Sequence, residues 1–80
     1  MTDVIRARVT RVVAETLRVD PHTVSDELAA GDVPTWDSLG HVTVLQALEQ
    51  EFGLVFDIDD ALAIESVGDM VEVLARLHTA

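Results

Sequence analysis

The stretch of sequence that decides the fold is residues 37–56, D-S-L-G-H-V-T-V-L-Q-A-L-E-Q-E-F-G-L-V-F. Its apolar residues recur at spacings of three and four, which is the period of an amphipathic helix. Asp37 or Ser38 can cap the start of this helix, and Gly53 lies where a helix usually ends. We therefore predict a helix over residues 38–52, with a buried face formed by Leu39, Val42, Leu45, Leu48 and Phe52.

Helical periodicity also appears on both sides of this stretch. It predicts a first helix over residues 3–18, with a buried face formed by Ile5, Val9, Val12, Val13 and Leu17. A short helix is expected around residues 59–64. A last helix opens at Ser66 and Asp69, a pair that resembles a capping box, and its buried face is formed by Val67, Met70, Val71, Leu74 and Leu77.

Residues 19–37 form a long connection, because Pro21, Gly31 and Pro34 prevent one continuous helix. Val24 and Leu28 predict a short turn over residues 23–28 that holds this loop against the core. The expected fold is an all-α bundle of three main helices, with a short helix before the last one and a long ordered loop between the first and second. We expect residues 1–80 to form a single domain.

Composition and charge exclude several classes of function. The chain of 80 residues is 49% hydrophobic, which is too apolar for a disordered protein. It has no cysteine, which excludes a disulfide scaffold, a cysteine nucleophile and a thiolate zinc site. The formal net charge of −10 disfavours nucleic acid and anionic membranes and favours a basic protein partner. Residues 1–18 carry four arginines against Asp3 and Glu15, so the acidic excess lies in the rest of the chain.

No secretory signal and no apolar run of membrane-spanning length is found, so we expect a cytoplasmic protein. We expect it to be a monomer.

Ser38 is the residue with the clearest chemical potential. In one interpretation, Asp37 and Ser38 do no more than cap a helix. In the other, the Ser38 hydroxyl is displayed at a helix N-terminus, where a phosphodiester would be well placed. His41 lies one helical turn later and could act as a base. However, position 36 is Trp, where the G-x-S-x-G motif of serine hydrolases has its first glycine. Trp36 could guide a partner or prosthetic arm, but a lone Trp beside a helix start more often packs against the bundle.

Asp57, Asp59 and Asp60 form an acidic cluster that could bind calcium weakly. The EF-hand pattern is not met, because Leu62 occupies the position of its required glycine and Gly68 occupies the twelfth position, where a Glu is required. A solvated acidic face is the preferred interpretation.

Taken together, these motifs resemble the acyl carrier protein family. The resemblance rests on D-S-L-G at residues 37–40, on L-Q-A-L-E-Q-E-F-G-L-V-F at residues 45–56 and on V-G-D at residues 67–69, and it covers nearly the whole chain. It implies that the chain is not an enzyme. It also implies that Ser38 carries a covalent 4′-phosphopantetheine, which a Mg²⁺-dependent phosphopantetheinyl transferase supplies from coenzyme A. Acyl cargo would be held on the arm as a thioester.

The resemblance further implies brief docking on acyl-loading, acyl-transferring or condensing enzymes with basic surfaces. The docking candidates carried over from the family are Asp37, Leu39, Glu49, Asp57, Asp59 and Asp60. Fatty-acid carriers have acidic residues just after D-S-L, whereas this chain has Gly40, His41 and Thr43. W-D-S-L-G-H is more similar to freestanding carriers of specialised polyketide or mixed polyketide and peptide pathways.

Two alternatives stay open. An aminoacyl or peptidyl carrier is one, although such carriers typically have G-G-x-S where this chain has T-W-D-S at residues 35–38. The other is an acidic helical interaction module, which would be calcium-responsive if the Asp57 to Asp60 cluster binds the ion.

Overall fold

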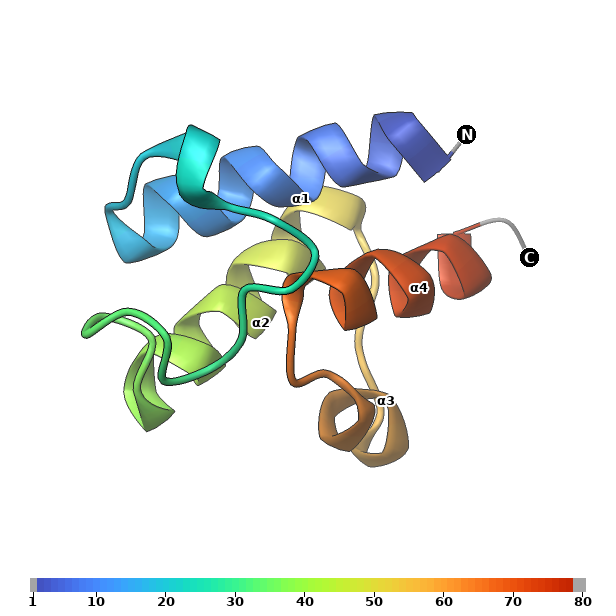
Figure 1. Ribbon diagram of the computed structural model, residues 1–80. Helices are drawn as coiled ribbons and strands as arrows, with labels where there is room; N and C mark the ends of the chain where they lie inside the picture. Colours follow the sequence, from blue (N-terminus) through green and yellow to red (C-terminus); the bar gives the residue numbers. More distant parts are fainter. Residues whose placement is uncertain (1, 79–80) are drawn as a thin grey trace.

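The computed structural model describes residues 2–78, which form a bundle of α-helices (Figure 1). In chain order the elements are α1 (Thr2–Leu17), the 3-10 helix η1 (Pro21–Thr23), α2 (Ser38–Phe52), α3 (Ile58–Ala63) and α4 (Val67–His78). Over these residues there is no β-strand, only an isolated bridge between Ala29 and Ser66. The predicted all-α fold is therefore confirmed. Across the same residues, no helix combines the length and the apolar character that a membrane crossing requires.

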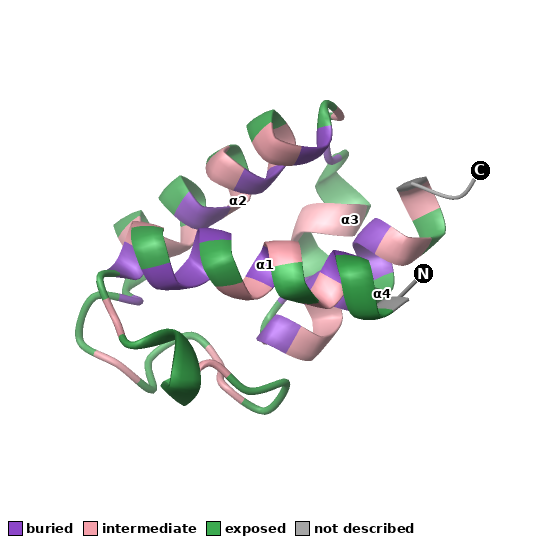
Figure 2. Cartoon of the chain, turned by 90° about the horizontal axis from the view of Figure 1, so that it is seen from above, coloured by how far each residue is buried: buried purple, intermediate pink, exposed green. Residues whose placement is uncertain are grey.

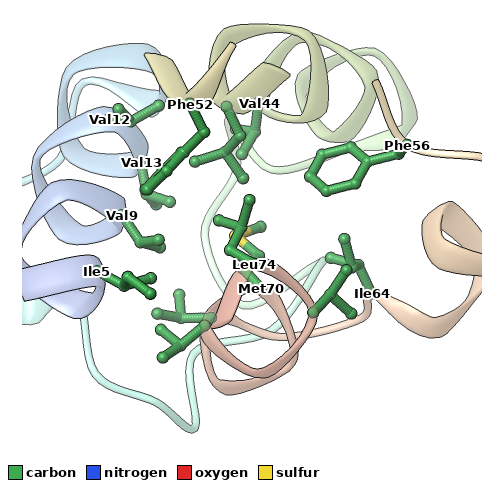
Figure 3. Close-up of a cluster of buried hydrophobic side chains, with 14 of the residues drawn as sticks. Ile5, Val9, Val12, Val13, Val44, Phe52, Phe56, Ile64, Met70 and Leu74 are labelled. Carbon is green, nitrogen blue, oxygen red and sulfur yellow. The ribbon is translucent and has the colours of Figure 1, made fainter. Parts of the chain in front are cut away.

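The core lies where α1 packs against α2 and α4 (Figure 3). Every residue of the predicted α1 face is buried, and Ala14 is buried with them. Met70, Val71 and Leu74 of α4 are also buried as predicted, while Leu77 is half-buried. Among the described side chains, no polar or charged residue is buried. The hydrophobic effect therefore holds a bundle whose valine-rich first helix has only modest intrinsic helix propensity.

The predicted buried face of α2 is wrong in its first half. Leu48 and Phe52 are buried, but Leu39 is 75% exposed and Val42 is 50% exposed. Val44, which the periodicity did not select, is fully buried instead. Figure 2 shows the buried segments of α2 on the side that faces α1. Apolar residues occur on more than one side of this helix, so two overlapping stripes fit the helical period and only packing against α1 decides between them.

A charged cluster joins the end of α2 to the middle of α1. Glu51 accepts a hydrogen bond from Arg8 Nε at 3.0 Å, and it pairs with Arg11 Nη2 at 2.8 Å. The Arg8 guanidinium also lies over the Phe52 ring, 4.2 Å from its centroid, in a cation–π contact. The hydrogen bonds from Arg11 and Arg8 lower the pKa of the Glu51 carboxyl below its ordinary value. Arginines of the basic N-terminal segment are thus partly neutralised inside the molecule.

The connection between α1 and α2 is ordered by its ends and by α4. Arg18 adopts a left-handed conformation (φ 58°) at the end of α1, and the carboxylate of Asp20 caps η1. The short turn predicted over residues 23–28 is present: Val24 is extended after η1, and the chain then turns with a hydrogen bond from the Leu28 amide to the Ser25 carbonyl. Extended backbone at the C-cap of η1 prevents the helix from continuing.

Backbone hydrogen bonds then join this connection to the start of α4. Ala30 donates to the Glu65 carbonyl, and the amides of Val67 and Gly68 donate to Leu28 and Asp26. Most of the connection is exposed (Figure 2). Order in this loop therefore comes from main-chain pairing as well as from the half-buried Val24 and Leu28.

α3 begins one residue earlier than predicted, at Ile58, because Asp57 is its N-cap. The Asp57 carboxylate accepts from the Asp60 amide at 2.7 Å. At the start of α4, the Ser66 hydroxyl accepts from the Asp69 amide at 3.2 Å, as the capping-box pattern predicts. The Asp69 carboxylate accepts a hydrogen bond from the Glu65 amide, whereas in a capping box it would accept from the Ser66 amide.

Candidate functional site

Ser38 is the first residue of α2 and its side chain is exposed. Asp37 is the N-cap: its Oδ1 accepts from the Gly40 amide at 2.8 Å, and its carbonyl accepts from the His41 amide. Of the two capping candidates that the sequence offered, the structure selects Asp37. The Ser38 hydroxyl is consequently not used for capping, and it lies at the positive end of the helix dipole.

Gly40 allows the loop to approach the first turn of α2. A Cβ built at this position would clash with the Thr35 carbonyl oxygen and lie 3.3 Å from the Asp37 carboxylate. Any side chain would therefore push residue 35 away from the helix. Glycine is therefore required sterically at this position of D-S-L-G, because it lets residue 35 lie against the first turn of α2, next to Ser38.

Trp36 and His41 form a pair directly beside Ser38. Trp36 is 0% exposed, and its Nε1 donates to His41 Nδ1 at 2.9 Å. The two rings are stacked, with centroids 6.1 Å apart and planes inclined by 17°. Backbone hydrogen bonds of Trp36 to Val33 and Gly31 fix the loop around it. The packing interpretation of Trp36 is confirmed.

This pairing bears on the hydrolase alternative. An indole N–H can only donate, so His41 Nδ1 must be the acceptor, and in a neutral ring the proton is then on Nε2. A general base needs a free ring nitrogen to accept the serine proton. The acceptor nitrogen of His41 is already used by Trp36, so the arrangement does not provide Ser38 with a base.

An open pocket of about 460 Å³ adjoins the serine. It is lined by Ala30, Gly31, Trp36, Asp37, Ser38 and His41. The long loop supplies one side of this pocket and the first turn of α2 supplies the other. Ser38 thus lies at the edge of a preformed recess rather than on a flat surface.

The six predicted docking residues fall into two groups. Asp37 and Asp57 are helix caps, and Glu49 accepts a hydrogen bond from the Phe56 amide at 2.8 Å. Asp60 pairs with Arg76 at 3.3 Å. Leu39 and Asp59 are exposed, and the described residues offer neither side chain a hydrogen-bond or ionic partner. Four of the six candidates therefore also hold local structure.

Apart from Leu39, which was also a docking candidate, sequence reasoning missed a set of exposed apolar side chains. They occur at the start of α2, in the connector after it, and in α3. These residues are Leu39, Val42, Val55, Ile58 and Leu62. The signal was present for Leu39 and Val42, but their helical spacing was taken as a sign of burial. Such exposed apolar residues are typical of surfaces that contact partners.

The acidic cluster does not form a metal site in this structure. Asp57 and Asp60 are engaged with a backbone amide and with Arg76, respectively. Within the described residues, no three His, Cys, Asp or Glu side chains come together in an arrangement that could hold a metal ion. The calcium-responsive alternative therefore has no preformed site to support it.

Comparison with known proteins gives a consistent result. A family model described as "Phosphopantetheine attachment site" matches residues 7–74. The acyl carrier protein of Caulobacter vibrioides (strain NA1000 / CB15N) is 35% identical over 76 residues, which cover 95% of this chain and 96% of that protein. The acyl carrier protein of Phenylobacterium zucineum (strain HLK1) is 36% identical over 74 residues, which cover 92% of each.

Proposed function

Because this chain belongs to the acyl carrier protein family, we propose that Ser38 is the residue to which its 4′-phosphopantetheine arm is attached. Family membership establishes a phosphopantetheine-bearing acyl carrier, and it confirms the prediction of a carrier rather than an enzyme. The observation that supports Ser38 is its exposed hydroxyl at the start of α2, inside the matched region. When attached, the arm supplies a terminal thiol that holds acyl groups as thioesters.

The residues around Ser38 fit a phosphodiester. The amides of Ser38 and Leu39 belong to the first turn of α2, where intrahelical acceptors are lacking. Helix N-termini of this kind bind phosphate groups favourably. The nearest carboxylate, Asp37, is held by the Gly40 amide. Ser38 is thus reachable by a modifying enzyme and set in surroundings that suit the modified side chain.

Carriers of this family work with biosynthetic enzymes and with a phosphopantetheinyl transferase, and we propose that this chain docks on their basic surfaces through α2 and α3. The docking candidates remain Asp37, Leu39, Glu49, Asp57, Asp59 and Asp60. Leu39 and Asp59 are the candidates most available to a partner, because they are exposed and no described residue holds either side chain by a hydrogen bond or ion pair. Weak, electrostatically steered encounters suit a shuttle, and tethering raises the effective concentration of the cargo at each partner.

We also propose that the pathway is a specialised one of the polyketide type. The support is the first part of α2, which has no Asp, Glu, Lys or Arg between Leu39 and Leu48 and exposes Leu39 and Val42. Such a surface offers little to enzymes that select acidic carriers. The holo protein should be loaded faster by a malonyl transferase from a polyketide pathway than by one from fatty-acid synthesis. The reverse order would contradict this proposal, and loading by an amino-acid-activating enzyme would favour the aminoacyl or peptidyl alternative.

The attachment site is tested by intact mass spectrometry after incubation with coenzyme A, Mg²⁺ and a broad-specificity phosphopantetheinyl transferase. The chain has only three serines, Ser25, Ser38 and Ser66. We expect the wild type to gain one phosphopantetheinyl group and Ser38→Ala to gain none, with its helical circular dichroism unchanged. Ser25→Ala is the matched control, because Ser25 is also exposed and should not affect modification. Modification that persists in Ser38→Ala would contradict the proposal.

A further inference from the structure

We propose that His41, oriented by Trp36, is a hydrogen-bond donor to the phosphodiester of the arm on Ser38, so that the pocket beside Ser38 is a subsite for that phosphodiester. The inference rests on the proposed attachment at Ser38. It concerns two residues that the carrier function by itself does not require.

The chemistry of the Trp36–His41 pair sets the proton on the imidazole. Trp36 Nε1 donates to His41 Nδ1 at 2.9 Å, and a neutral imidazole has one donor and one acceptor. The proton of the neutral ring is therefore on Nε2. Trp36 is completely buried and its ring is stacked on His41, so the imidazole is held in this orientation.

The Nε2–H has no partner among the described residues, although the ring lines the pocket next to Ser38. Long side chains on a helix lean toward its N-terminus and cover the residues three and four positions before them. For His41 these positions are Ser38 and Asp37, which line the same pocket. The Asp37 carboxylate is oriented by the Gly40 amide, and a phosphodiester on Ser38 would place an anionic acceptor on the pocket side of the imidazole for this donor.

A purely structural role for His41 makes a different prediction. If the imidazole served only to satisfy the Trp36 indole, its Nε2–H would remain in water whether or not Ser38 is modified. If His41 binds the arm, modification of Ser38 changes the NMR signals of the imidazole, and removal of the imidazole changes the ³¹P signal of the phosphodiester. The two roles can therefore be separated by observing both nuclei.

The experiment compares ¹⁵N-labelled apo and holo protein by NMR, with the holo state verified by intact mass. In both states His41 Nδ1 should have the chemical shift of an unprotonated acceptor nitrogen. On conversion to holo, the Nε2–H proton should move downfield. The ³¹P signal of the phosphodiester should shift in His41→Ala and stay at the wild-type position in His22→Ala. His22 is the matched control, because its side chain is 95% exposed on η1 and pairs with Asp20.

The outcomes separate this proposal from the one on which it rests. A chain that is modified at Ser38, but whose His41 signals are the same in the apo and holo states, overturns the subsite and leaves the carrier function intact. A chain that never gains mass overturns both. If His41→Ala does not fold, the comparison of wild-type apo and holo protein decides alone, and His41→Gln provides a variant that keeps an acceptor for Trp36.

Discussion

α2 has an exposed leucine near its start and a buried leucine in its second half, and this contrast allows its packing to be tested. Leu48 is 0% exposed and Leu39 is 75% exposed, although both lie on the stripe that helical periodicity selects. Truncating a fully buried leucine costs about 2–5 kcal/mol, because apolar surface is lost and a cavity remains. Truncating an exposed one changes stability by about 0.5 kcal/mol or less. We therefore expect Leu48→Ala to lose a large share of the roughly 5–15 kcal/mol typical of a small domain, and Leu39→Ala to lose almost none.

Equilibrium urea unfolding followed by far-UV circular dichroism measures this difference. With a slope of about 1 kcal/mol per molar urea, the midpoint of Leu48→Ala should fall by about 2 M or more, while that of Leu39→Ala should stay near the wild-type value. Equal shifts in the two variants would refute the burial assigned to α2. A larger shift in Leu39→Ala would mean that the helix packs on the face that its periodicity alone suggests.

Three further outcomes follow from contacts described above. Gly40→Ala should destabilise the protein by about 1–3 kcal/mol in urea unfolding, despite the better helix propensity of alanine, because its Cβ meets the Thr35 carbonyl; a stabilised variant would contradict that contact. Arg11 and Arg8 lower the pKa of Glu51 in the folded state. The contribution of Glu51 to the free energy of unfolding is therefore present above its unfolded-state pKa and is lost as the pH falls through its folded-state pKa. Between pH 7 and about pH 3 the urea midpoint should accordingly fall further in the wild type than in Glu51→Gln, and parallel curves would refute this. Finally, with a net charge of −10, the midpoint should rise between about 0.01 M and 0.15 M ionic strength, and a flat dependence would mean that repulsion is unimportant.

The sequence was sufficient for the helices whose apolar residues fall on one side. α1 has a single apolar stripe, so its face could be predicted residue by residue, and the same holds for most of α4. α2 carries apolar residues on more than one side, and Val44 and Leu39 exchange roles relative to the prediction. Periodicity specifies that one side is buried, but the neighbour against which a helix packs specifies which side.

The site shows the same division between local and long-range information. The position of Ser38 at the start of α2 could be predicted, since caps depend on a few adjacent residues. The Trp36–His41 hydrogen bond could not, because it requires the loop backbone to turn the indole toward the first helical turn. The contact of Arg8 and Arg11 with Glu51 was also out of reach, because it joins residues about 40 positions apart.

The backbone hydrogen bonds between residues 26–30 and residues 65–68 couple the recess beside Ser38 to the start of α4. Ala30 lines that recess and also donates to the Glu65 carbonyl, just before α4 begins. A displacement of the start of α4 would therefore also displace one wall of the recess.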